Sequence, residues 1–187
     1  RVLFRSDAVL KNINSIKKTV NSTNLPNIYL LHGEFTDIEM NELYNHSKVT
    51  AMVSLTKGEG FGRPLLEFSL SKKPIIASNW SGHIDFLQKD FCLLVNGTLT
   101  NVHPSAVVQN MILPESQWFT PNDGEVADAY KKVYENYSKC LEGAKRQAHY
   151  SKTNFSFDKM TEVLDNVLET KVPKQVALKL PSLKKIK

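Results

Sequence analysis

The stretch that decides the fold is Lys57-Gly58-Glu59-Gly60-Phe61-Gly62-Arg63-Pro64-Leu65-Leu66-Glu67. It follows a β-rich apolar run at 49–55, and it holds three glycines within five residues. Glycines keep side chains away from a turn, so its backbone N–H groups can face a ligand. Pro64 suits the start of a helix, because its missing N–H would have no partner there. The pattern predicts a buried strand, a glycine turn and a helix to about Ser71.

A glycine turn that opens a helix predicts an anion site, because free N–H groups and the positive end of the helix dipole point at one place. We expect the amides of Gly62, Arg63 and Leu65 to contribute, since the proline has none. Two carboxylates bracket the turn. Glu67, one turn into the helix, can accept hydrogen bonds from a diol beside the phosphate site, and Glu59 can reach hydroxyls of whatever the phosphate carries.

Helical and strand patterns alternate along the chain. The expected helices are 7–20, 36–46 behind a Thr36–Glu39 capping box, the helix after the glycine turn, 81–87, 123–151 and 157–170. The expected strands are 27–32, ending at Gly33, then 49–55, 74–78 and 91–95. This alternation predicts an α/β fold: a parallel sheet covered by helices on both faces, with ligands at the carboxyl ends of the strands.

The last third of the chain gives weaker signals. Residues 96–122 lack periodicity and include several prolines, so we expect a long loop. An apolar stripe that includes Tyr130 and Tyr134 predicts a single core helix over 123–151. Ser156 is expected to cap the final helix, and residues 172–187 form a basic tail.

Composition limits the function classes. With 187 residues, 41% of them hydrophobic and 23% charged, the chain predicts one soluble domain without an apolar run of the roughly 18 residues that a membrane span needs. Cys92 and Cys140 match no disulfide or zinc spacing, which favours a reducing, cytoplasmic setting. The net charge of +5 is concentrated in the tail. We therefore expect no nucleic-acid partner and either simple solvation of the tail or a weak contact with a membrane surface or acidic partner.

The first six residues, Arg1-Val2-Leu3-Phe4-Arg5-Ser6, match one reading frame of a widely used sequencing adapter. We interpret residues 1–6 as an assembly artefact and the chain as a metagenomic fragment whose natural N-terminus is missing.

The nine residues 59–67, EGFGRPLLE, with their Glu59-x7-Glu67 spacing, are followed by KPIIAS at 73–78. Together they resemble the donor-site signature of retaining GT-B glycosyltransferases of the glycosyl transferases group 1 type. The similarity runs from about 28 to 95 and more weakly from 119 to 168. It implies that residues 7–171 are a Rossmann-like donor-nucleotide-binding domain, the C-terminal half of a GT-B fold followed by C-terminal helices. Residues 97–121 are then a loop insertion.

The resemblance also implies roles. The family counterpart of Glu67 binds the nucleotide ribose, that of Glu59 contacts the transferred sugar, and the glycine-turn amides hold sugar and diphosphate. The implied donor-binding residues are Glu59, Gly60, Phe61, Gly62, Arg63, Leu65 and Glu67. A second group lies at neighbouring strand ends: His32, Gly33, Trp80, Gly82 and His83. The family needs no metal and no further cofactor, and no residue is assigned as a catalytic base, although Glu59 is a candidate for sugar contact.

Several positions leave alternatives open. Arg63, usually apolar in the family, either assists the diphosphate by charge or is an exposed surface arginine. Trp80 either lines the sugar pocket or packs on the insertion. His83 is either functional or a hydrogen-bonded surface histidine. Ser71-Lys72-Lys73 stands at the helix end where the family has glycine, so we expect a lysine in a left-handed turn.

The implied function is therefore a glycosyltransferase fragment that binds a nucleotide-diphospho-sugar for retaining transfer to an unknown acceptor. The family's N-terminal domain, which binds the acceptor, is expected to be missing from this fragment. The alternative is a non-catalytic module that binds a nucleotide-sugar or phosphate. A dinucleotide oxidoreductase is disfavoured because no G-x-G-x-x-G follows the earlier strand.

Overall fold

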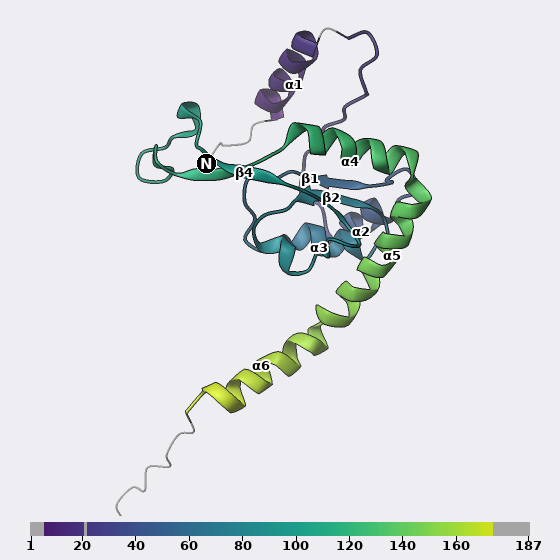
Figure 1. Ribbon diagram of the computed structural model, residues 1–187, viewed down its shortest axis with the longest axis vertical. Coiled ribbons are helices and arrows are strands. Elements are labelled where there is room, and N and C mark those ends of the chain that lie inside the picture. Colours follow the sequence, from purple (N-terminus) through teal and green to yellow (C-terminus); the bar gives the residue numbers. More distant parts are fainter. Residues whose placement is uncertain (1–5, 21, 174–187) are drawn as a thin grey trace, which may run out of the picture. The chain divides into compact units, whose positions relative to one another are not determined.

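A three-stranded parallel sheet in the order β1-β2-β3 organises the fold (Figure 1). The strands are β1 (Met52–Ser54), β2 (Ile75–Ser78) and β3 (Leu93–Val95). The computed structural model describes residues 6–20 and 22–173, so the interpretations of residues 1–5 and 174–187 lie outside the described part. Among the described residues β1 pairs only with β2, so it is an edge strand there, and Val53 is 37% exposed. The prediction that this strand is buried is wrong, whereas β2 is buried throughout.

The sheet is covered on both faces, as predicted (Figure 1). Successive β2 side chains point to opposite faces. Ile75 packs into one cluster with Leu65 of α3 (Arg63–Ser69), while Ile76 packs into another with Ala129 of α4 (Asp123–Glu135). Full burial of each large apolar side chain is worth about 1.5–3 kcal/mol. The chain therefore has a Rossmann-like α/β fold whose sheet is held between α3 and α4.

The described residues divide into two units at Leu43 and Tyr44. In the first, α1 (Ser6–Val20) forms the helix predicted at 7–20, and none of its residues is buried. Residues 27–32 form no strand, and Tyr29 and Leu31 are 83% and 62% exposed, so the prediction of a buried strand is wrong. A strand exists only when a neighbouring backbone completes its ladder, and a short apolar run cannot indicate whether that neighbour is present.

The capping box at the next helix is confirmed. α2 (Asp37–Asn45) begins after Thr36, whose N–H donates to Glu39 Oε2 at 2.8 Å, while Glu39 N–H donates to Thr36 Oγ1 at 3.3 Å. The backbone hydrogen bond from Thr36 lowers the pKa of the Glu39 carboxyl. The predicted start of this helix is therefore correct.

The elements that follow the glycine turn also form where predicted. A short 3-10 helix, η1 (Gly82–Asp85), lies between β2 and β3. α3 ends at Ser69, two residues earlier than expected, and Lys72 has φ 61°. The left-handed lysine is therefore confirmed; this conformation costs a residue with a Cβ about 1–2 kcal/mol.

Residues 96–122 are not a loop but contain a hairpin. β4 (Gly97–Asn101) pairs antiparallel with β5 (Gln117–Pro121), and the short helix η2 (Pro104–Ala106) lies in the connection. The hydroxyls of Thr100 and Thr120 face each other across the strands at 2.7 Å. The prediction of a long loop is wrong because the prolines lie in the connection and at the last position of a strand, where no ladder N–H is needed.

The helix predicted at 123–151 is two helices. α4 ends at Glu135, Asn136 adopts φ −125° and ψ 40°, and α5 (Tyr137–Asn154) follows. Tyr130 and Tyr134 are 50% and 89% exposed, so their assignment to a core stripe is wrong. A stripe that stays in phase across a one-residue break cannot be distinguished by spacing from one continuous helix.

Polar side chains fix α5 against the rest of its unit. Gln147, 1% exposed, donates from Nε2 to the carbonyl of Phe86 at 2.8 Å and accepts from the N–H of Gln88 at 2.9 Å. The hydroxyl of Ser69 in α3 donates to that of Ser151 at 2.8 Å. Buried polar groups are tolerated when they are paired in this way.

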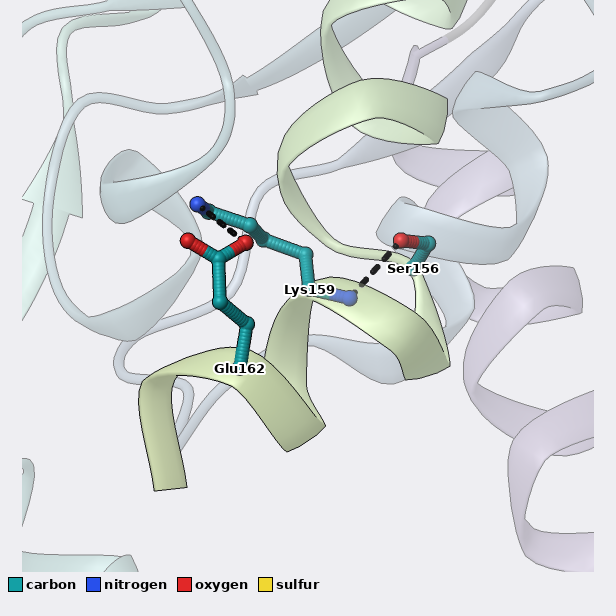
Figure 2. A network of polar contacts seen from close by, with 3 residues as sticks. All are labelled: Ser156, Lys159 and Glu162. Atoms are coloured by element: carbon teal, nitrogen blue, oxygen red, sulfur yellow. Dashed lines mark hydrogen bonds and ion pairs between the residues drawn. The ribbon is translucent and has the colours of Figure 1, made fainter. Parts of the chain in front are cut away.

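The final helix, α6 (Phe157–Lys171), begins at the predicted cap. Ser156 Oγ accepts from Lys159 N–H at 3.2 Å, and Lys159 Nζ contacts Glu162 Oε2 at 2.8 Å (Figure 2). None of its residues is buried.

Candidate functional site

The glycine turn lies between the carboxyl end of β1 and α3, where the sequence places it. Gly62, the residue before α3, has φ 89° and ψ 44°, a left-handed conformation. A Cβ at this position would lie 2.9 Å from His83 Cβ and 3.2 Å from Glu59 Cγ. Both the backbone conformation and the lack of space therefore require glycine here.

The amides of the turn differ from expectation in one respect. Leu65 N–H donates to Gly62 O at 2.9 Å, so the prediction that it is free for an anion is wrong, because the first turn of α3 uses it. The N–H groups of Gly60, Phe61, Gly62 and Arg63 donate to no acceptor within the described part of the chain. Since α3 has only seven residues, its dipole is small and these turn amides are the principal donors.

The loop after β2 is tied to the turn by Ser81, a residue that sequence reasoning did not single out. Its hydroxyl donates to Glu59 O at 2.6 Å and accepts from Glu59 N–H at 2.9 Å. Gly82 N–H also donates to Glu59 O, at 2.9 Å. A Cβ on Gly82 would overlap the carbonyl oxygen of Gly60. The two loops thus approach each other backbone to backbone.

His83 lies beneath the turn, fully buried, so its interpretation as a surface histidine is wrong. Its Nε2 is 2.6 Å from Ser78 O. Because a carbonyl oxygen only accepts, Nε2 carries a proton and donates it to Ser78 O. Nδ1 is buried without a partner among the residues that the structure describes. An unpaired polar group of this kind is costly to bury. The His83 side chain joins η1 to the end of β2, with its Cβ beneath Gly62.

Glu67 belongs to a small polar group on the outer side of α3. Its Oε1 accepts from Arg63 Nε at 3.0 Å, and the two side chains are 41% and 76% exposed. Arg63 is thus an exposed arginine, as one of the two alternatives predicted. Burial raises the pKa of the Tyr44 hydroxyl, the Glu67 carboxylate raises it further, and Arg63 lowers it. Tyr44, which packs edge-on against Phe68 of α3, was missed from sequence.

Trp80 packs on the hairpin, as its alternative interpretation predicted. Its ring stacks on that of Phe119 with centroids 5.8 Å apart and an interplanar angle of 3°. Despite this stacking, Trp80 is still 41% exposed. Trp80 therefore presents aromatic surface at the carboxyl edge of the sheet.

His32 and Gly33 belong to the first unit, in an exposed segment without regular structure. Gly33 has φ 151° and no heavy atom within 4 Å of the position of a Cβ. Their expected place at the end of a strand is wrong, since that strand does not form.

The described residues offer no metal centre and no reactive buried thiol. No group of three or more His, Cys, Asp and Glu side chains gathers in a metal-binding arrangement within 6–20 and 22–173. Burial raises the pKa of the Cys92 thiol to about 12, so it is protonated and a poor nucleophile at neutral pH. None of the helices in the described segments has both the length and the apolar character to cross a bilayer.

The family model described as "Glycosyl transferases group 1" matches residues 11–114, which is more than half of the chain. The matched segment contains the glycine turn, α3, β2 and the loop with Ser81. No curated protein matches the chain.

Proposed function

Because the chain belongs to the glycosyl transferases group 1 family, we propose that the glycine turn of this glycosyltransferase domain binds a nucleotide-diphospho-sugar donor. The observation that carries the proposal is the turn itself. Four backbone N–H groups, of Gly60, Phe61, Gly62 and Arg63, have no acceptor in the described chain, and a carboxylate lies at either end of the turn. Unpaired backbone N–H groups gathered in one turn suit a diphosphate.

The two carboxylates take different ends of the donor. Glu67 accepts hydrogen bonds from the ribose hydroxyls through its carboxylate, whose Oε1 is paired with Arg63 before the donor binds. Glu59, tied to Ser81 by two hydrogen bonds, contacts the sugar. Exposed ion pairs are worth about 0–1 kcal/mol. The guanidinium of Arg63 is thus free to turn from Glu67 to the diphosphate at little cost.

The reaction proposed is transfer with retention, without a metal. Charge develops on the leaving diphosphate, and fixed backbone donors stabilise developing charge effectively because they need not reorganise. No side chain acts as a base in this scheme, and Glu59 is the candidate for contact with the reacting sugar. In this proposal the acceptor binds in the other half of the GT-B fold.

Calorimetry with UDP, GDP, UDP-glucose and GDP-mannose tests the proposal. Glu67→Ala removes a charged acceptor, for which hydrogen bonds are worth about 1.5–3 kcal/mol, so we expect affinity to fall about 10- to 100-fold. Glu162→Ala is the matched control, because Glu162 is also an exposed carboxylate in an ion pair, with Lys159 of α6. Absence of binding by the unaltered chain, or equal affinity of the Glu67→Ala variant, would contradict the proposed site.

A further inference from the structure

Phe119 of β5 connects the hairpin to the glycine turn. Its N–H donates to Lys57 O at 3.1 Å, at the start of the turn. Its ring stacks on Trp80 in the loop after β2, and Phe119 is 4% exposed. Lys57 follows β1, Trp80 follows β2 and the hairpin follows β3. One buried residue thus joins all three segments that leave the carboxyl edge of the sheet.

Neighbouring contacts hold the hairpin in this position. Lys57 Nζ lies 4.3 Å from the centroid of the Trp118 ring, a cation–π contact. At the base of the hairpin, Asn122 N–H donates to Asn96 O at 2.8 Å, and Asn96 N–H donates to Glu125 Oε2 at 2.8 Å. The hairpin is therefore fixed both at its base and against the glycine turn.

Trp80 is next in the chain to the residue that ties the loop after β2 to the glycine turn. It directly precedes Ser81, whose hydroxyl makes two hydrogen bonds to the backbone of Glu59. Glu67, assigned to the ribose, is instead grouped with Arg63 and affects the ionisation of Tyr44. Trp80 is thus one residue away from the contact that fixes the backbone of Glu59, the residue assigned to the sugar.

We propose that the β4–β5 hairpin is a further wall of the donor site, in which Phe119 is a positioning residue that holds the Trp80 ring as a stacking platform for the donor's sugar. This inference rests on the proposed donor binding. Sugar rings present C–H groups that pack on flat aromatic surfaces, and ligand pockets commonly use such side chains. Stacking on Phe119 fixes the indole before the ligand arrives, which reduces the ordering cost of binding.

Tryptophan fluorescence can measure whether the donor's sugar contacts the Trp80 ring. The chain has two tryptophans, so Trp118→Phe leaves Trp80 as the only one and keeps an aromatic ring under Lys57. In this background we expect UDP-glucose or GDP-mannose to change the Trp80 emission beyond the change caused by UDP or GDP alone. An identical response to nucleotide and nucleotide-sugar would overturn the inference.

Phe119→Leu tests the positioning role, because leucine keeps an apolar side chain but removes the stacked ring. We expect nucleotide-sugar affinity to fall about 3- to 10-fold, as for loss of an aromatic pair, with unchanged affinity for the nucleoside diphosphate. Met111→Leu is the control in the same hairpin, since Met111 is 76% exposed. Circular dichroism checks that each variant folds.

The outcomes separate the two proposals. If neither UDP nor GDP nor their sugars bind, the proposed donor site itself fails. If a nucleotide binds through Glu67 but Phe119→Leu binds its nucleotide-sugar as tightly as the unaltered chain, only the role of the hairpin is overturned. A loss of affinity for the nucleotide-sugar that spares the nucleotide supports both.

Discussion

Helices α3 and α6 obtain their stability in opposite ways. α3 has seven residues and no side-chain cap, but it buries Leu65, Phe68 and Ser69. α6 has fifteen residues and a serine cap, and it buries none. Isolated helices shorter than about 12–15 residues are marginal in water. Local signals therefore start and extend α6, whereas packing alone sustains α3 and with it the glycine turn.

The largest expected effect on stability comes from replacing a phenylalanine with alanine, which can be done in both helices. Phe68, 1% exposed, packs in the cluster with Ile75, and Phe68→Ala should lower the free energy of unfolding by about 3–5 kcal/mol. Phe157 is 80% exposed, so Phe157→Ala should change it by no more than about 0.5 kcal/mol. Urea denaturation measures both values. Similar effects in the two helices would refute the contrast.

Alanine substitutions at Gly82 and Gly58 test whether the close backbone approach of two loops positions the glycine turn beside α3. A Cβ at Gly82 would overlap Gly60 O, whereas one at Gly58 would meet no heavy atom within 4 Å. Gly82→Ala should therefore cost about 1–3 kcal/mol of stability, because the two loops must separate. Gly58→Ala should cost no more than about 0.5 kcal/mol. Thermal unfolding followed by circular dichroism distinguishes them, and a neutral Gly82→Ala would show that the loops tolerate separation.

The smallest expected effect concerns the cap of α6. Ser156→Ala removes the acceptor for Lys159 N–H and should destabilise this helix by about 1 kcal/mol. Because α6 buries none of its residues, the midpoint of global urea unfolding should not move. Faster hydrogen exchange confined to the amides of residues 157–171 is the expected result. The control is Ser156→Asp, which supplies another good cap and should keep the amides of residues 157–171 protected from exchange. A shift in the global midpoint of Ser156→Ala would show that α6 is coupled to the core.

Sequence reasoning succeeded where the signal is local. The Thr36–Glu39 capping box, the Ser156 cap and the left-handed Lys72 all form as predicted, since each depends on a few neighbouring residues. It failed where distant partners decide. Residues 27–32 lack a neighbouring strand, and the hairpin of residues 97–121 pairs two segments that each looked irregular.

For the candidate site, the sequence by itself determined the glycine turn, its two carboxylates and the strand and helix on either side. These follow from backbone preferences of glycine and proline and from apolar spacing, which are written in consecutive residues. Only the tertiary structure decided that Ser81 binds the Glu59 backbone, that His83 is buried beneath Gly62 and that Phe119 meets Lys57 and Trp80. Those contacts join residues far apart in the chain, and their geometry depends on how the whole sheet and its loops pack.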